Sequence, residues 1–308
     1  MKISYLDKVM YAENTSRWLM GQLLHTEKTE PFVGYKGKGL EWGKISENVV
    51  NDIDFLELHP DDKSTFEIPE CVSRLPNLKA LEIPSWFVPH LKENSFPNSV
   101  ESLHIGVRSE KKPKVNWDKN QQFLSVKSLY FNCEATSDFW ANCFPGLDMT
   151  LEFTMGHKNL NVGELGKLVK LKNLFLNNCE NVETLNALNS LGIGFFKLSF
   201  SKNQDFTGLS SFKNITEMEI RGCRKLVSLT GLENLKQLET LEIMHCPHLE
   251  DLGNIIDIQT LNYLLVMSCG KNWTKHIETI KSKFKNAGFQ EIRFEPDGNY
   301  SLLEVVRD

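Results

Sequence analysis

The cysteine and histidine side chains of this chain are the ones best suited to metal binding or nucleophilic chemistry. Four of its seven cysteines occupy the same position of a recurring sequence motif: Cys179, Cys223, Cys246 and Cys269. His245 and His248 flank the third of them. We expect Cys246 to point inward and His245 outward, and a column of inward thiols lacks the tetrahedral ligand set of a zinc site. The sequence therefore predicts no metal site and no cofactor.

Two other places could support catalysis. The segment Gly34–Gly39 reads GxxGxG instead of GxGxxG, so a glycine-rich turn is favoured over a phosphate cradle. Cys143 has no obvious histidine base near it in the sequence. We predict that the protein is not an enzyme, with these two places as the remaining candidates. The lysine-rich segment 109–120 is interpreted as a solvated loop, with a nucleic-acid contact as the alternative.

Composition and charge argue against several classes of partner. The chain has 308 residues, 41% of them hydrophobic, with 35 basic and 40 acidic side chains and a net charge of −5. This balance gives no global attraction to nucleic acid or anionic lipid. Charges interrupt the first twenty residues, and no window approaches the roughly 18 apolar residues of a membrane span. Because an odd number of cysteines does not suit a framework of disulfides, we expect a reduced, cytoplasmic protein. We also expect it to be monomeric when free.

The elements that position these residues come from a repeated pattern. The segment Leu238–Cys246 has the form LxxLxLxxC, and the same form recurs at Leu171, Ile215 and Leu261. The spacing averages roughly 24 residues. With looser copies, eleven units begin at Ile53, Leu78, Val100, Val126, Asp148, Leu171, Phe195, Ile215, Leu238, Leu261 and Phe289.

This phrasing resembles the leucine-rich repeat family, in its cysteine-containing form, over roughly residues 50 to 300. The resemblance implies an α/β solenoid: a horseshoe with a parallel concave β-sheet and short 3₁₀ or irregular convex turns. It also implies a binding scaffold, since the family serves many different partners. Within each unit, places four and six point into the core while places five and seven point outward.

The ends depart from the repeat. We expect residues 1–50 to form an N-terminal capping region, 51–288 the repeat array and 289–308 a capping hairpin. Ile277, Ile280, Phe284 and Ala287 form a helical stripe that Gly288 ends. A strand over 289–294, a turn at 296–298 and an antiparallel strand over 300–306 complete the prediction.

The outward rows predict the surface that meets a partner. The fifth places are Glu57, Glu82, His104, Tyr130, Glu152, Phe175, Ser199, Glu219, Glu242, Leu265 and Arg293. The seventh places are His59, Pro84, Gly106, Asn132, Thr154, Asn177, Ser201, Arg221, Met244, Met267 and Glu295. Exposed aromatic and methionine side chains among acidic ones are typical of protein interfaces.

We therefore predict a protein-binding surface on the concave face, with glutamates that steer a basic partner. Its predicted residues are Glu57, Glu82, Tyr130, Glu152, Phe175, Asn177, Glu219, Arg221, Glu242, Met244, His245 and Met267. The predicted function is stoichiometric inhibition, or immunity-type neutralisation of a toxin or nuclease. A general scaffold or adaptor is the alternative.

Overall fold

The computed structural model describes residues 54–58, 68, 70–106, 118, 120–132, 140–153, 162–177, 192–207, 212, 214–297 and 300–307. The predicted N-terminal cap, its glycine-rich segment and most of the lysine-rich loop lie outside these residues. The chain divides into two compact units, unit 1 (1–155) and unit 2 (156–308). No helix in the described ranges is both long and apolar enough to cross a membrane.

Unit 1 is a stack of parallel strands in chain order. Its strands are β1 (Phe55–Glu57), β2 (Ala80–Ile83), β3 (Ser102–Ile105), β4 (Ser128–Phe131) and β5 (Thr150–Phe153). Short 3₁₀ helices lie between strands: η2 (Glu70–Arg74), η3 (Ser85–His90) and η4 (Ala141–Cys143). Leucines at the fourth place pair across neighbouring strands, as Leu81 does with Leu103.

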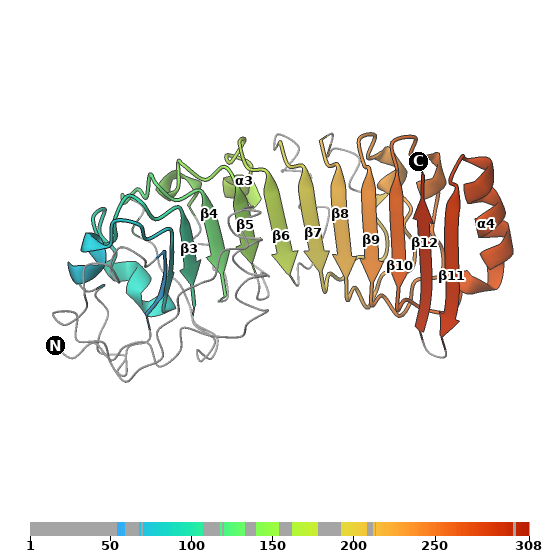
Figure 1. Ribbon diagram of the computed structural model, residues 1–308, viewed down its shortest axis with the longest axis horizontal. Coiled ribbons are helices and arrows are strands. Elements are labelled where there is room, and N and C mark those ends of the chain that lie inside the picture. The colour runs from blue at the N-terminus through green and yellow to red at the C-terminus, as the bar shows by residue number, and fades with distance from the viewer. Residues whose placement is uncertain are drawn as a thin grey trace. The chain divides into compact units, whose positions relative to one another are not determined.

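Unit 2 continues the same architecture with longer strands, seen side by side in Figure 1. Its parallel strands are β6 (Asn173–Asn177), β7 (Phe195–Ser199), β8 (Glu217–Arg221), β9 (Thr240–Met244) and β10 (Tyr263–Met267). Its helices are α3 (Val162–Leu165), η7 (Leu232–Asn234), η8 (Ile255–Asp257), η9 (Trp273–His276) and α4 (Ile277–Asn286). An antiparallel pair, β11 (Glu291–Asp297) and β12 (Tyr300–Val306), completes it.

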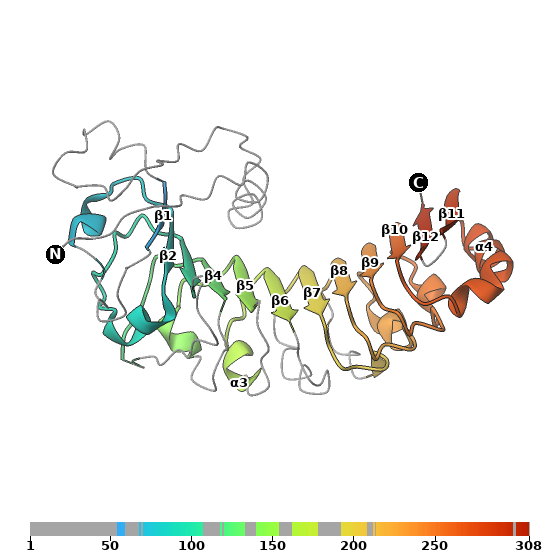
Figure 2. The same ribbon diagram turned by 90° about the horizontal axis from the view of Figure 1, so that it is seen from below.

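The alternation of the repeat explains this arrangement. On β9, Leu241 and Ile243 are fully buried, and their register partners on β10, Leu264 and Val266, are buried as well. Each rung therefore buries its apolar residues against its neighbours. The return segment turns through η7, as its three-residue apolar step predicts. Figure 2 shows the strands of unit 2 nearly end-on, with the return segments on one side of the sheet. The predicted solenoid of parallel strands is confirmed.

The ninth places form a buried column of thiols. Cys223, Cys246 and Cys269 are unpaired and at most 2% exposed. The Sγ of Cys246 donates to the carbonyl oxygen of Met244 (3.5 Å), and the Sγ of Cys269 to that of Met267 (3.4 Å). Hydrogen bonding to Cys246 and burial raise the pKa of the Cys223 thiol. The column is part of the core, and Cys179 lies outside the described residues.

One repeat begins two residues earlier than the sequence predicts. In β7, Phe196 and Leu198 are buried and Lys197 pairs in register with Glu219. The unit therefore starts at Ile193, which is also buried. In this frame Ser201 takes the ninth place, where its Oγ donates to the Sγ of Cys223 at 3.3 Å. The placements of Ser199 in the fifth row and Ser201 in the seventh row were wrong.

The hairpin is present, but its order along the sheet differs from the prediction. The strand that pairs with β10 is β12, in antiparallel orientation, and β11 lies beyond it. Leu265 therefore has Glu304 as its register partner in place of Arg293, and Met267 has Leu302 in place of Glu295. Strand β11 also runs on to Asp297 instead of ending at 294. Helix α4 ends at Asn286, before Gly288 with φ of 90°, as predicted.

We predict that two glycines with positive φ respond differently to alanine. Gly231 (φ 103°) would place a new Cβ 2.2 Å from the backbone of Phe206 on the neighbouring turn, whereas Gly288 (φ 90°) has nothing within 4 Å. Gly288→Ala should cost only the left-handed backbone strain, about 1 kcal/mol. Gly231→Ala must also push two turns apart and should cost about 3 kcal/mol or more in the free energy of unfolding. Equal losses in urea unfolding would contradict the close packing of these turns.

Candidate functional site

The third, fifth and seventh places of β6 to β10, with the matching places of β12, form what we call the outward face of unit 2. The fifth-place row, in register across the strands, is Phe175, Lys197, Glu219, Glu242, Leu265 and Glu304. The seventh-place row is Asn177, Ser199, Arg221, Met244, Met267 and Leu302. These positions alternate with the ones that point into the solenoid core, and those that are exposed or half-buried are available for recognition.

The structure brings most of the predicted binding residues together on this face. They are Phe175, Asn177, Glu219, Arg221, Glu242, Met244 and Met267. Arg221 is exposed, the methionines and glutamates are half-buried, and Phe175 is only 7% exposed. The expectation of an exposed Phe175 was wrong, because its ring packs edge-on against Phe195 at a centroid distance of 5.1 Å. His245 follows at the eighth place and is exposed, as predicted.

Unit 1 carries the remaining predicted residues in one row. They are Glu57, Glu82, Tyr130 and Glu152, and together with His104 of the same row they are register partners on successive strands. Glu82 and Glu152 are half-buried, and the side chain of Glu57 lies outside the described residues.

The expectation of an exposed Tyr130 was wrong. Tyr130 is 6% exposed, and its ring stacks on that of His104 with centroids 4.6 Å apart. Burial lowers the pKa of His104 to about 3 and raises that of Tyr130. This row places two aromatic rings in a buried stack instead of presenting them to a partner.

A cation that the sequence interpretation missed lies within the acidic row of unit 2. The Nζ of Lys197 lies 2.9 Å from Oε2 of Glu219, and the two side chains are 20% and 14% exposed. Because the repeat was predicted to start at Phe195 instead of Ile193, the fifth place was given to Ser199, and the ion pair of Lys197 was not expected. The available signal was the alternation of polar Lys197 and Ser199 with apolar Phe196 and Leu198. Glu219 is therefore paired within the protein.

Glu242 has a different electrostatic environment. It has no ion pair within the part of the chain that the structure describes, and its neighbours in the row are Glu219 and Leu265. Burial, followed by the charge of Glu219, raises the pKa of Glu242, while Lys197 opposes the shift. An ionised Glu242 is therefore less favourable in the folded chain than in water.

Apolar side chains lie beside Glu242. We call Met244, Leu265, Met267 and Leu302 the apolar patch; all four are half-buried, on neighbouring strands in register. On its far side stands Glu304, whose Oε1 accepts a hydrogen bond from the hydroxyl of Tyr263 at 3.2 Å. Burial and the charge of Glu304 raise the pKa of Tyr263 to about 12, so this hydroxyl stays a donor at neutral pH.

The eighth places form one edge of the outward face. Phe200, His245 and Ser268 have left-handed backbones with φ of 52°, 57° and 55°, and Gly222 has 65°. This turn brings the ninth residue of each unit into the core, and it leaves Phe200 50% exposed. A left-handed phenylalanine is unusual, and such strain concentrates at functional positions. The sequence interpretation did not single out Phe200.

The catalytic alternatives find little structural support among the described residues. Cys143 is fully buried, and its Sγ donates to the carbonyl oxygen of Asp118 at 3.7 Å. No group of three or more histidine, cysteine, aspartate or glutamate side chains within the described ranges is placed to hold a metal ion. The glycine-rich segment 34–39 lies outside them.

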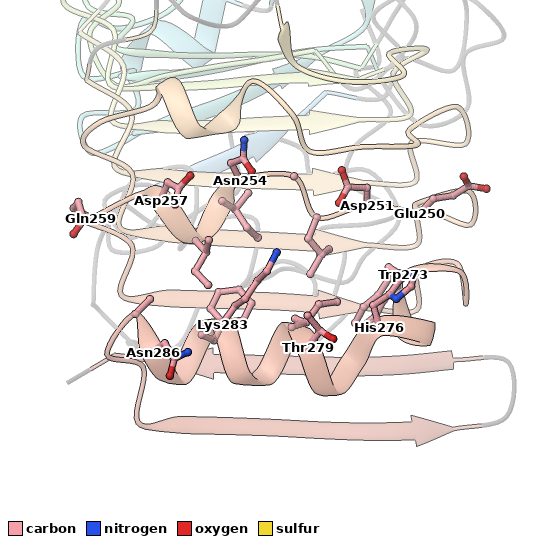
Figure 3. A pocket seen from close by; sticks show the side chains of 17 residues that line it. Glu250, Asp251, Asn254, Asp257, Gln259, Trp273, His276, Thr279, Lys283 and Asn286 are labelled. Carbon is pink, nitrogen blue, oxygen red and sulfur yellow. The ribbon is translucent and has the colours of Figure 1, made fainter.

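A groove of about 680 Å³ lies between α4 and η8, on the side of the return segments (Figure 3). Buried Ile255, Trp273 and Phe284 line it, and charged Asp257 and Lys283 stand at its rim. The lining mixes apolar groups with charges of both signs. It is separate from the outward face.

Comparisons with known proteins return leucine-rich repeat structures. Internalin C2 of Listeria monocytogenes is 16% identical, with a TM-score of 0.38, over 70% of this chain and 82% of that chain. InlP of the same organism is 14% identical, with a TM-score of 0.35, over 92% and 85%. A leucine-rich repeat protein of Leptospira interrogans is 12% identical, with a TM-score of 0.27, over 70% and 60%.

No protein-family model and no curated protein sequence matches the chain. At these identities and TM-scores the likeness to solved structures carries no information about function. The solenoid fold rests on the strand pairing of this chain itself.

We predict opposite effects for two glutamates on the outward face. Because the folded state holds the Glu242 proton more tightly than the unfolded chain, its ionised form costs stability at neutral pH, and the cost disappears as pH falls through the raised pKa. Glu242→Gln should therefore preserve or raise the free energy of unfolding at pH 7. Glu219→Gln breaks a half-buried ion pair and should lower it by about 1 kcal/mol.

Urea unfolding at pH 7 and pH 5 measures both effects. The difference between the wild type and Glu242→Gln should shrink at the lower pH. A clear loss of stability in Glu242→Gln at pH 7 would show that Glu242 is compensated within the chain.

Proposed function

We propose that this chain is a leucine-rich repeat protein that recognises another protein through the outward face of unit 2. The observation that carries the proposal is the apolar patch, four half-buried side chains on three neighbouring strands, with Glu242 and Glu304 on either side of its Leu265. These residues face away from the core, so the fold does not require them to be apolar. A contiguous apolar surface within a charged rim is what partner-binding sites have.

The regular pairing of the strands supports a role in recognition. Side chains on paired strands keep fixed spacings of about 4.8 Å between neighbours. Such an array offers a preorganised surface, which lowers the entropic cost of association. The methionines of the patch add adaptable apolar contacts.

The proposed activity is stoichiometric binding that occludes the partner, as in an inhibitor or an immunity-type protein that neutralises a toxin or nuclease. The carboxylates of this face favour a partner with a basic surface, because complementary charge raises association rates. The proposed compartment is the cytoplasm. Unpaired Cys223, Cys246 and Cys269 support a reducing environment, where thiols persist.

We predict that capture of the partner depends on the apolar patch. The full chain, immobilised and exposed to extract of its host, should retain one protein at a ratio near one to one. Met267→Arg places a charge in the middle of the patch and should reduce retention at least tenfold. The control, Val227→Arg, changes an exposed side chain on a return segment and should retain the partner fully.

Two outcomes would change the assignment. Several partners at unequal ratios, all lost with Met267→Arg, would make the protein an adaptor instead of an inhibitor. Equal retention by Met267→Arg and the wild type would show that recognition does not use the outward face of unit 2.

A further inference from the structure

We propose that the partner anchors to this surface through an arginine side chain that lies over Leu265 and reaches both Glu242 and Glu304. This inference deepens the proposed function by naming the chemistry of the partner's central contact. It is carried by the register of three strands, by the pairing of the nearby charges and by the apolar patch.

The strand register sets two carboxylates on opposite sides of one apolar side chain. Leu265 of β10 has Glu242 as its register partner on β9 and Glu304 on β12. With neighbouring strands about 4.8 Å apart, the two glutamates stand two strand spacings from each other. The N–H donors of a guanidinium lie in one plane and point in several directions. One arginine can therefore donate to two separated carboxylates, with nitrogen–oxygen distances of about 2.8 Å.

Among the residues that the structure describes, the cations nearest Leu265 leave Glu242 without an ion pair and Glu304 with only a long one. Lys197 is paired with Glu219 at 2.9 Å. Arg293 donates to Glu295 at 2.6 and 2.8 Å and forms a longer ion pair with Glu304 at 3.7 Å. Because Arg293 is the register partner of Glu304 on β11, it lies on the opposite side of Glu304 from Leu265. Arg221 stands at the seventh place of β8, two strands from Leu265.

The surroundings of Leu265 suit the rest of an arginine. Its aliphatic stem would cover Leu265 and the methionines of the patch, as such stems do on apolar surfaces. Tyr263, two residues before Leu265 on the same face of β10, offers a ring on which a guanidinium can stack. Its hydroxyl already donates to Glu304 and holds that carboxylate in place. A lysine, as a single point charge, would reach only one of the two carboxylates.

The test uses a library of random twelve-residue peptides displayed on phage and panned against the full chain. Enriched peptides should contain an arginine next to apolar residues. For a synthetic copy of one such peptide, replacing arginine with lysine should weaken binding about tenfold, and replacing it with uncharged citrulline should weaken it further. Glu242→Gln/Glu304→Gln should lose at least tenfold in affinity.

The matched control is Glu239→Gln/Glu278→Gln, which changes net charge equally through two exposed glutamates outside the Leu265 row and should bind normally. Failure to enrich arginine-containing peptides, equal binding of the lysine peptide, or full binding by Glu242→Gln/Glu304→Gln would each overturn the arginine assignment. If such peptides are still lost with Met267→Arg, the recognition surface stands without the arginine. If Met267→Arg binds them too, the proposed surface itself fails.

Discussion

Each rung of this protein buries its apolar side chains only against the rungs on either side, and everything else in the structure depends on that packing. Leu241 and Ile243 are fully buried with register partners on both neighbouring strands, and the thiols of Cys223, Cys246 and Cys269 form a buried column of their own. The alignment of the inner rows fixes the alignment of the outer rows, because successive side chains of a strand alternate between faces. A recognition surface thus follows from core packing.

Stacked strands also place like charges close together, and the neighbouring glutamates Glu219 and Glu242 differ in how this is resolved. Glu219 is neutralised by Lys197 from the neighbouring strand. Glu242, one strand further, has no ion pair within the described residues, and burial together with the charge of Glu219 raises its pKa. A half-buried carboxylate with a raised pKa beside an apolar patch is easier to explain by binding than by folding, since functional sites often trade stability for activity.

The sequence was sufficient for the fold and for most of the outward face, because LxxLxLxxC fixes both the strand and its direction. The prediction failed where the motif departs from its consensus. Ser201 takes the ninth place, where other units have a cysteine, so the start of the unit at Ile193 was predicted two residues too late and Lys197 was missed. Strand order at the C-terminal end is a long-range property that local pattern does not encode, so Glu304 was not expected beside Leu265. Burial of Tyr130 arises from stacking on His104, which alternation does not reveal.

The pairing of β10 with β12 is the most direct point of test, because both the order of the sheet and the carboxylate pair around Leu265 depend on it. In an antiparallel pair, opposed Cα atoms are about 4.5–5.5 Å apart, within disulfide range, whereas diagonal neighbours are about 7–8 Å apart. Mild oxidation and peptide mapping should find a disulfide in Leu265→Cys/Glu304→Cys and none between the new cysteines of Leu265→Cys/Val306→Cys. Equal bridging in both variants, or bridging only to position 306, would contradict the register and the surface built on it.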